Sequence, residues 1–324
     1  MKVLVTGGLG YIGSNITLKL IKKNFTVIVV DNLSNSSRTK IKKIKNLSKK
    51  NFIFIKADCK NKNKIFEIFK RYKPNLVIHL AGLKSVSEST VNPNLYYREN
   101  ILSALNIFDA MKKYNVNNLI FSSSATVYGN PEYLPLDENH STEPQNPYGS
   151  SKLIIEKYLL EFCKINKNWS ALALRYFNPV GSDPSGMLCD NPKFPNNLFP
   201  KIYQFMTGKL KFLPIYGNDY KTKDGSAIRD YIHILDLADC HIDSIKYLKK
   251  NKGFHVFNVG TGKGLTVNEV VKNFEKINNI KIKIKAKKRR AGDVAAVYAG
   301  VKKIHKLIGW KSKFNINEMC LIKK

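Results

Sequence analysis

A glycine-rich loop after the first apolar run constrains the fold more than any other feature of this sequence. The segment TGGLGYIG connects the apolar run Lys2–Thr6 to the helical pattern of Tyr11–Lys23. Gly7, Gly10 and Gly13 allow a tight turn in which backbone N–H groups approach a pyrophosphate, and the N-terminus of the following helix adds a partial positive charge. The loop therefore predicts a dinucleotide-binding βαβ unit.

The second apolar run ends in a carboxylate, which indicates how the nucleotide would be held. Asp31 closes the sequence VIVVD, and a carboxylate there accepts hydrogen bonds from an adenosine ribose while repelling a 2′-phosphate. No arginine follows immediately, which favours NAD, and Arg38 and Lys40 leave NADP as the alternative. Asp58 ends the next run and is either a contact of the adenine amino group or an ordinary loop residue.

Short apolar runs alternate with amphipathic stretches through the first half of the chain. Strands are expected at Lys2–Thr6, Thr26–Val30, Phe52–Ala57, Leu76–Ala81, Leu119–Ser122 and Ala171–Arg175, and later at Val256–Val259. Helices are expected at Tyr11–Lys23, Lys64–Tyr72, Tyr97–Tyr114, Pro147–Lys164 and Val267–Ile277. This alternation predicts an α/β fold, a Rossmann-type doubly wound parallel sheet with helices on both faces.

The composition of the chain changes after Asn178, where prolines and glycines become frequent and the expected elements become shorter. We expect a dinucleotide-binding Rossmann domain over 1–177 and a smaller C-terminal α/β substrate domain over 178–324. Part of 230–262 is expected to pack back on the first domain. A length of 324 residues accommodates two domains of this size.

The charge balance is strongly basic, with 55 lysines and arginines against 24 acidic residues and a net charge of +31. A nucleic-acid binder is one interpretation of this balance. Only seven of these residues are arginine, the type favoured for base readout and bidentate phosphate contacts. The lysines are spread along the chain beside many Asn and Ile residues, all with AT-rich codons. We therefore favour a biased genome over a specific nucleic-acid site.

Cysteine usage and hydropathy indicate a reducing compartment. The five cysteines are scattered, odd in number and form no CxxC pair, so we expect free thiols and neither a disulfide framework nor a metal site. No apolar run approaches the ~20 residues that cross a bilayer, and the start MKVLVTGG is unlike a secretory signal. A cytoplasmic protein without a membrane partner is expected.

A second group of motifs carries candidate chemistry. Tyr148 and Lys152 form a YxxxK unit at the head of an expected helix, where residues i and i+4 share a face. The nearby ammonium is expected to lower the tyrosine pKa from its usual ~10 and make the phenol a general base. Ser124, in the strand-end sequence FSSSATVYG, is expected to hydrogen-bond a substrate hydroxyl. With the glycine loop and Asp31, these residues predict hydride transfer between NAD and an alcohol.

The chain resembles the extended short-chain dehydrogenase/reductases, and within them the UDP-glucose 4-epimerases, over nearly its whole length. The resemblance is carried by VLVTGGLGYIGSN, VDNLSNSSR, VIHLAGLKSVSES, FSSSATVYG, NPYGSSK, LRYFNPVGSDPSG, PNNLFP, YGNDYKTKDGSAIRDYIH and RRAGD. It implies an isomerase that interconverts UDP-glucose and UDP-galactose. Tyr148 removes the proton of the sugar O4, NAD takes the C4 hydride, and the 4-keto sugar turns over while UDP stays held. The hydride then returns to the opposite face, so NAD must not leave between the half-reactions.

The resemblance also assigns contacts residue by residue. The catalytic set that it implies is Ser124, Tyr148 and Lys152. The cofactor contacts that it implies are Gly7, Gly10, Tyr11, Ile12, Gly13, Asp31, Asn32, Leu33, Ser34, Asn35, Ser36, Asp58, Cys59, Leu80, Ala81, Gly82, Leu83, Lys84, Asn100, Ser122, Tyr148, Lys152 and Phe177. The substrate contacts that it implies fall into three sets. The first set is Lys84, Ser124, Tyr148 and Val297, and the second, at the diphosphate, is Asn178, Arg229 and Arg290. The third set, around the uridine, is Asn197, Leu198, Pro214, Tyr216 and Asp293.

Further expectations come from the same resemblance. The helices Tyr97–Tyr114 and Pro147–Lys164 are expected to pair with those of a second copy in a homodimer. Val297 stands where relatives have a residue lining the sugar pocket, and its small size predicts acceptance of UDP-GlcNAc and UDP-GalNAc, unless Tyr298 fills the gap. Glu99 stands where relatives often have Asn, so a hydrogen-bond donor to the cofactor is expected to be missing. The chain also ends earlier than its relatives, which is expected to leave some surface open.

Three other functions remain as alternatives. A nucleotide-sugar 4,6-dehydratase needs an acid–base carboxylate pair beside the strand-end serine, where this chain has Ala125 and Thr126. A UDP-glucuronate decarboxylase fits less well, since RYFNPVGSDPSG and PNNLFP match the epimerases better. A non-catalytic NAD sensor or nucleic-acid binder fits the charge, and the intact Ser124, Tyr148 and Lys152 count against it.

Overall fold

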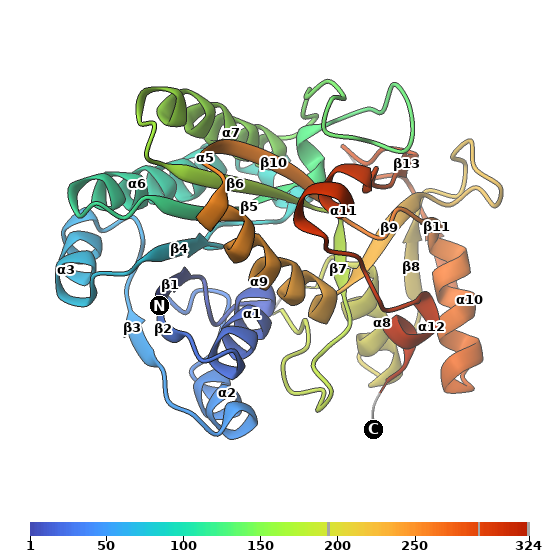
Figure 1. Ribbon diagram of the computed structural model, residues 1–324. Coiled ribbons are helices and arrows are strands. Elements are labelled where there is room, and N and C mark those ends of the chain that lie inside the picture. The colour runs from blue at the N-terminus through green and yellow to red at the C-terminus, as the bar shows by residue number, and fades with distance from the viewer. Residues whose placement is uncertain (193–194, 291, 323–324) are drawn as a thin grey trace.

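The computed structural model describes residues 1–192, 195–290 and 292–322. A seven-stranded parallel sheet, ordered β10–β6–β5–β4–β1–β2–β3, forms its larger part (Figure 1). The strands are β1 (Lys2–Thr6), β2 (Thr26–Asp31), β3 (Ile53–Lys56), β4 (Leu76–His79), β5 (Asn118–Ser124), β6 (Ser170–Tyr176) and β10 (Gly253–Val259). Because the pairing is parallel throughout, the carboxyl ends of all seven strands lie along one edge of the sheet.

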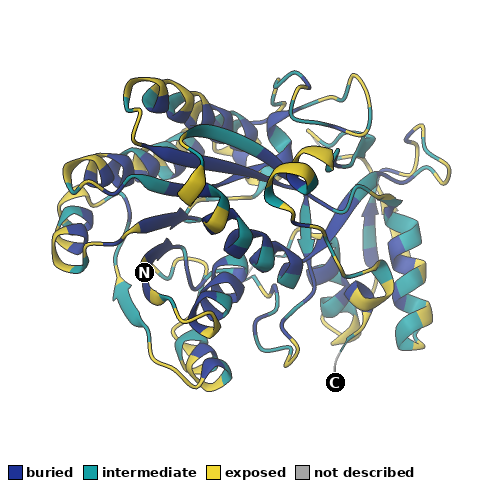
Figure 2. Ribbon diagram, viewed as in Figure 1, coloured by how far each residue is buried: buried dark blue, intermediate teal, exposed yellow. Residues whose placement is uncertain are grey.

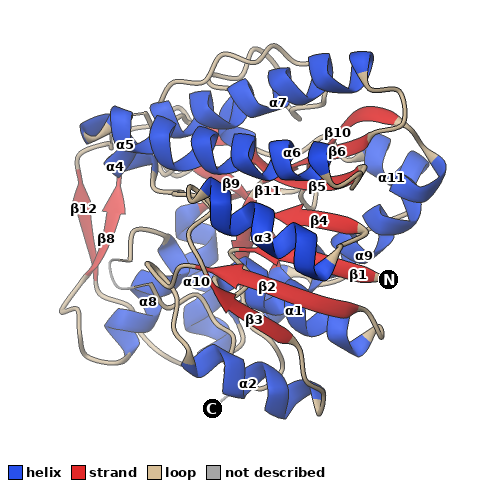
Figure 3. Cartoon of the chain, turned by 90° about the vertical axis from the view of Figure 1, so that its left-hand side faces the viewer, coloured by secondary structure: helices blue, strands red, loops and turns tan. Residues whose placement is uncertain are grey.

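The central strands are continuous apolar runs because helices cover both of their faces. The segment KVLVT of β1 and the segment TVIVVD of β2 are buried from their second residue onward. Valine and isoleucine suit a pleated surface, and burial on both faces removes the alternation seen in half-exposed sheets. The helices on one face are α1 (Tyr11–Lys22), α2 (Thr39–Ser48), α9 (Ile234–Lys250) and α11 (Lys302–Ile308). Those on the other are α3 (Lys62–Tyr72), α6 (Ser103–Lys113) and α7 (Pro147–Ile165) (Figure 3).

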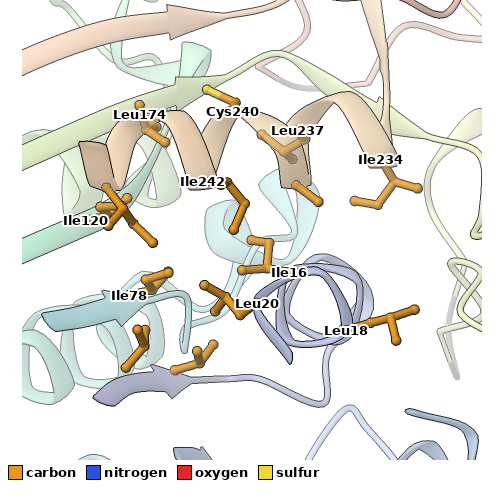
Figure 4. Close-up of a cluster of buried hydrophobic side chains, with 14 of the residues drawn as sticks. Ile16, Leu18, Leu20, Ile78, Ile120, Leu174, Ile234, Leu237, Cys240 and Ile242 are labelled. Carbon is orange, nitrogen blue, oxygen red and sulfur yellow. The ribbon is translucent and has the colours of Figure 1, made fainter. Parts of the chain in front are cut away.

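Two elements from the second half of the chain complete this first sheet. Strand β10 pairs with β6 along its whole length, and α9 packs against α1. Ile16 and Leu20 of α1 meet Ile234 and Leu237 of α9 in one buried cluster above the strands (Figure 4). The sheet and its helices therefore form a three-layer unit, with dark blue buried strands in the middle (Figure 2). The division of the chain into 1–177 and 178–324 stays a prediction.

The remaining elements form a smaller part beside the carboxyl edge of the large sheet. Strand β9 (Ile228–His233) pairs with β7 (Asn178–Val180), β11 (Gly264–Thr266) and β13 (Ala296–Val297), and β8 (Leu213–Tyr216) pairs with β12 (Ile284–Lys287). The helices α8 (Leu198–Met206), α10 (Val267–Asn278) and α12 (Ile316–Cys320) pack around these strands. The short elements α4 (Val86–Val91), α5 (Pro93–Tyr97), the π-helix η1 (Arg98–Leu102) and the 3₁₀ turn η2 (Ala125–Val127) connect strands of the large sheet.

Three of the differences between the expected and the observed helices have a cause in the sequence. The helix expected over Tyr97–Tyr114 is interrupted, because η1 inserts a π-turn before α6 begins. Helix α2 has no expected counterpart because its lysine-rich sequence has a thin apolar stripe around Ile44. Helix α9 also has no expected counterpart, because polar residues interrupt its apolar pattern. The carboxylate of one of these, Asp236, accepts hydrogen bonds from the backbone N–H groups of Lys313 and Phe314, both 3.0 Å away.

Two features are absent from the described part of the chain. No helix there is both long and apolar enough to cross a membrane. The same residues contain no cluster of three or more His, Cys, Asp or Glu side chains able to hold a metal ion. Parallel α/β folds bind their ligands at the carboxyl edge of the sheet.

Candidate active site

The glycine loop between β1 and α1 is shaped so that side chains would not fit. Gly7 has a positive φ of 65°, and its N–H donates to the carbonyl of Val30 at 2.8 Å. A Cβ on Gly13 would lie 2.1 Å from the carbonyl oxygen of Gly7, and one on Gly10 would lie 3.2 Å from the same atom. The N-terminus of α1 is thus left open to a close ligand, as a dinucleotide pyrophosphate requires.

Asp31 organises the loop that follows β2. Its buried carboxylate accepts hydrogen bonds from the N–H of Leu9 (3.0 Å), the N–H of Leu33 (2.9 Å) and the hydroxyl of Ser36 (2.8 Å). A carboxylate has about four lone-pair positions, so capacity remains for one ribose hydroxyl. The amide of Asn32 donates to Asp58 at 3.2 Å, which joins the ends of β2 and β3 where the adenosine is expected.

Glu99 is paired with a lysine that follows β3. The ammonium of Lys60 forms an ion pair with Glu99 and lies 3.9 Å from the carboxylate of Asp58. The hydrogen bond that Lys60 donates to Glu99 raises the pKa of Lys60 above its ordinary value. The expected loss of a hydrogen-bond donor at this place is therefore accompanied by a new cation beside it.

Asn100 fixes the loop after β4. Its Oδ1 accepts from the N–H of Leu83 at 2.8 Å, and its Nδ2 donates to the hydroxyl of Ser151 on α7 at 2.9 Å. A Cβ on Gly82 would lie 2.8 Å from the Asn100 Oδ1, so only glycine allows this approach. The π-helix that carries Asn100 aims it inward, a use that is typical of π-turns at functional sites.

Tyr148 and Lys152 lie on the face of α7 that packs on the end of β5. The amide of Asn146 caps the helix by accepting from the N–H of Gly149 at 2.9 Å. The ammonium of Lys152 donates to the carbonyl of Ser122 at 2.8 Å and lies 5.9 Å from the centre of the Tyr148 ring. Both side chains are buried, because α7 faces the sheet at this position.

The electrostatics of this pair differ from the expectation. Burial raises the pKa of Tyr148 above 10.0, although the Ser124 hydroxyl, which hydrogen-bonds the phenol, opposes this rise. Burial also lowers the pKa of Lys152 from 10.5 to about 8, and the carboxylate of Glu156 opposes that shift. The lowered tyrosine pKa expected beside Lys152 is therefore not found, because desolvation of the phenolate is the largest influence on it.

A cavity of about 320 Å³ opens above these residues, between the large sheet and the smaller part. Ser124 and Tyr148 line it from the large sheet, and Arg229 and Val297, paired in register between β9 and β13, line it from the smaller part. Lys152 is not part of the lining, since it lies behind Tyr148. The cavity is large enough for a small organic ligand.

Cations gather around one carboxylate and one aromatic ring of the cavity. The Nε of Arg290 donates to Asp293 at 2.8 Å, and the Nη2 of Arg229 lies 3.9 Å from the other oxygen of the same carboxylate. Lys201 donates to the hydroxyl of Tyr216 at 3.0 Å, while the Arg290 guanidinium lies 4.9 Å from the centre of its ring. Fixed guanidinium forks of this kind suit a phosphate group.

The structure brings the predicted site residues together in two groups. The cavity is lined by all the predicted substrate contacts, which are Lys84, Ser124, Tyr148, Asn178, Asn197, Leu198, Pro214, Tyr216, Arg229, Arg290, Asp293 and Val297. Tyr11, Ile12 and Phe177 of the predicted cofactor set also line it. The other predicted cofactor contacts lie on the glycine loop, at the carboxyl ends of the strands or on helices next to them. Their assignment to NAD stays a prediction.

Thr126, Lys201 and Asp190 are among the site residues that were not predicted. Thr126 donates to the Ser124 hydroxyl at 2.9 Å and so orients it. Lys201 reaches Tyr216 from α8, and Asp190 lies 3.6 Å from the Lys84 ammonium. The motif FSSSATVYG contains Thr126 and could have indicated its role, whereas no local pattern marks Asp190 or Lys201.

Comparisons with known proteins decide the family. The profile of the GDP-mannose 4,6 dehydratase family matches residues 4–322. A pea protein named bifunctional UDP-glucose 4-epimerase and UDP-xylose 4-epimerase 1 is 43% identical over 98% of this chain and 93% of its own length. Human UDP-glucose 4-epimerase is 42% identical over 98% of this chain and 94% of its own. The chain belongs to the UDP-glucose 4-epimerase family.

A solved structure agrees with this family. The UDP-glucose 4-epimerase of Bifidobacterium longum, crystallised with NAD⁺ and UDP, superposes with a TM-score of 0.96 at 42% identity, covering 99% of this chain and 96% of that one. Ala125 and Thr126 line the cavity next to Ser124, at the place where the dehydratase alternative was expected to need a carboxylate pair.

The glycine loop yields the first prediction. Gly13→Ala is expected to abolish NAD binding, because its Cβ would meet the Gly7 carbonyl at 2.1 Å and open the loop. Gly10→Ala is the graded control, since its Cβ would lie 3.2 Å from that oxygen and needs only a small shift. NAD released on denaturing the purified proteins measures the effect, and thermal unfolding checks the fold. A folded Gly13→Ala variant with parental NAD content would contradict the prediction.

Proposed function

We propose that the protein interconverts UDP-glucose and UDP-galactose with NAD, as an isomerase acting at C4 of the sugar. The observation that carries this proposal is the opening of Ser124 and Tyr148 into the same cavity as Arg229 and Arg290. One end of such a cavity suits proton and hydride transfer, and the arginines suit a diphosphate. The identity of 42–45% to proteins named UDP-glucose 4-epimerase supports the reaction.

Residues of the large sheet would hold the cofactor. The glycine loop leaves the N-terminus of α1 open for the pyrophosphate, and Asp31 retains a lone-pair position for the adenosine ribose. The ammonium of Lys152 is held by the Ser122 carbonyl beside Tyr148. From this position it would also hold the nicotinamide ribose. Bound NAD supplies a reversible hydride acceptor, which returns the hydride to either face of the C4 ketone.

The proton of the sugar O4 is transferred to Tyr148 in this proposal. The Ser124 hydroxyl, oriented by Thr126, shares a hydrogen bond with the phenol and can hold O4 beside it. Because burial raises the tyrosine pKa, the phenolate needs the positive charge of Lys152 together with that of a nicotinamide ring. Removal of the proton is thereby tied to occupancy of the cofactor site.

The nucleotide end of the substrate is held and its sugar end is free to turn. Arg229 and Arg290 are fixed through Asp293, so they would bind the diphosphate without reorganising. The cavity wall near the reacting groups includes the small or apolar side chains of Ala125 and Val297. A sugar in contact with such a wall can present either face of C4 while its UDP stays in place.

The function yields the second prediction. The purified protein is expected to convert UDP-galactose to UDP-glucose without added NAD, and Tyr148→Phe is expected to lower kcat by ~10²–10⁴-fold, as loss of an acid–base group does. Tyr133→Phe is the matched control, because Tyr133 is exposed and lies outside the cavity lining. Near-parental turnover by Tyr148→Phe would remove this residue from the reaction, and an inactive parent protein would overturn the proposed function.

A second substrate pair is supported by Val297. This residue lines the cavity, whereas the ring of Tyr298 packs beside Gly264, whose Cβ would lie 2.9 Å from it. Tyr298 is absent from the cavity lining and so does not fill the space beside Val297. We therefore propose that UDP-GlcNAc and UDP-GalNAc are also accepted.

Val297→Tyr provides the third prediction. The added ring is expected to exclude the N-acetyl sugars by steric conflict while UDP-galactose turnover is retained, lowered at most by the ~10–200-fold that a lost apolar contact of ~1–3 kcal/mol costs. The measurement is kcat/KM for UDP-GalNAc and UDP-galactose in both proteins. A parent enzyme that ignores UDP-GalNAc, or a tyrosine variant that accepts it equally well, contradicts the proposal.

We also propose a homodimer built on the outer faces of α5, η1 and α7. Leu95, Leu102, Ile154 and Leu160 are 41–43% exposed on these elements, although each is a large apolar side chain. The helices α5, α6 and α7 run along the same outer layer (Figure 3). A two-fold contact between two copies would cover these side chains, and such isologous pairs are the commonest oligomers.

The dimer yields the fourth prediction. Leu102→Glu combined with Ile154→Glu is expected to convert the dimer to a monomer, because two carboxylates per copy would be buried without partners. Leu307→Glu on α11 is the matched control, since Leu307 is 46% exposed on a helix at another surface. Light scattering at micromolar concentration gives the mass. A monomeric parent protein, or a dimeric double variant, would refute the interface.

The cytoplasm remains the proposed compartment. All five cysteines are free, and Cys59, Cys163, Cys240 and Cys320 are buried. Free thiols in a chain of this size are typical of reducing surroundings. No specific nucleic-acid partner is proposed.

A further inference from the structure

A third residue of α7 follows Tyr148 and Lys152 on the same helix face. Glu156 stands four residues after Lys152, and its side chain is 3% exposed. A carboxylate is costly to bury unless it is paired and hydrogen-bonded. Arg175 on β6 satisfies it, with Nη2 2.6 Å from one carboxylate oxygen and Nε 3.1 Å from the other. The pair is bidentate. Neither residue belongs to the lining of the cavity, so the pair lies outside the cavity wall.

The same carboxylate reaches the strand that carries Ser124. The hydroxyl of Ser123 donates to Glu156, so one side chain of α7 contacts both β5 and β6. Ser123 lies between Ser122, whose carbonyl accepts from Lys152, and Ser124, which hydrogen-bonds Tyr148. A displacement of Glu156 would therefore shift the strand that positions both catalytic partners of the helix.

The charges around the Lys152 ammonium point to the same residue. From β4 the ring of His79 faces it, but burial lowers the His79 pKa to about 3, so this ring is neutral. From β5 come the Ser122 carbonyl and the ring of Phe121, whose centre is 4.9 Å from the ammonium. Along α7 lies neutral Tyr148. Glu156 is the carboxylate that opposes the loss of the Lys152 proton.

Arg175 is directed away from Lys152 by further contacts. Its guanidinium lies 4.7 Å from the centre of the Tyr128 ring, and the Tyr128 hydroxyl donates to Asn258 at 2.6 Å. The remaining phenol in this region, Tyr176, hydrogen-bonds with the ring of His241 and is uncharged, since burial raises its pKa. Glu156 thus supplies a negative charge that favours the protonated form of Lys152.

We propose that Glu156 is a positioning residue for the reaction, which holds the buried Lys152 ammonium charged and fixes β5 beneath Ser124. The inference rests on the proposed function. It differs from a purely structural role in one respect, because a structural role requires only a filled space, whereas this role requires the negative charge. Replacing the carboxylate by the isosteric amide removes the charge but keeps the shape, and so distinguishes the charge-dependent role from the structural role.

Glu156→Gln is expected to lower kcat at least tenfold while KM for UDP-galactose stays within about twofold, because Glu156 does not line the cavity. The alkaline limit of activity is expected to move down by about one pH unit or more, since loss of the nearby negative charge lets Lys152 release its proton earlier. The dissociation constant of NAD is the second readout. It is expected to weaken at pH above 8 and to match the parental value at pH 6, where Lys152 is charged in both proteins.

Two further variants keep the test decisive. Glu156→Gln with Arg175→Gln avoids a buried unpaired guanidinium and is used if the single variant does not fold, with the same alkaline shift expected. Glu161→Gln is the matched control, since Glu161 is an exposed carboxylate on the same helix, paired with Lys164. Its kinetics and NAD binding are expected to be parental.

A folded variant with a parental alkaline limit and parental NAD binding at high pH overturns the proposal. An unchanged alkaline limit with a raised KM also overturns it, because that pattern indicates a substrate contact. An inactive parent protein refutes the proposed function instead, and the pH dependence of NAD binding then decides the role of Glu156 by itself.

Discussion

The contact between α7 and the end of β5 is the interaction on which the active site depends. The three serines of 122–124 meet three residues of α7, which are Tyr148, Lys152 and Glu156. A helix brings residues four apart onto one face, so a single element engages the whole strand end. Asn146 fixes where this helix begins, because its amide caps the first turn. The position of the phenol over the cavity follows from these contacts.

Much of the fold and the reacting group could be predicted because their signals are local. The glycine loop, the parallel strands and the YxxxK unit each lie within one short segment, and secondary structure alone brings them into use. The rest depends on partners far away in sequence. Asp190 and Lys201 reach the cavity from positions outside the quoted motifs, and Lys60 pairs with Glu99 across four intervening elements. The raised pKa of Tyr148 also escaped prediction, because desolvation depends on everything packed around the ring.

Arginines and lysines both contribute to the site, but arginines supply its guanidinium forks. Arg175, Arg229, Arg289 and Arg290 each pair with a carboxylate, two of them in the cavity wall and one in the buried core. Such positions require a fork-shaped cation that keeps its charge when desolvated. Lysines supply most of the excess charge of +31. The basic composition and the chemistry of the site are therefore separate properties of the chain.

The pairing of β10 with β6 has a consequence for the order of events on the ribosome. The large sheet uses strands from the first 176 residues, yet its last strand ends at Val259. Until that segment has been synthesised, β6 is an open edge and α1 lacks the apolar partner that α9 provides. Open edges and exposed apolar faces promote aggregation of partly folded chains. The nascent protein is thus most prone to aggregation after β6 has been made and before α9 and β10 have been made. Once α9 and β10 leave the ribosome, they cover α1 and the edge of β6.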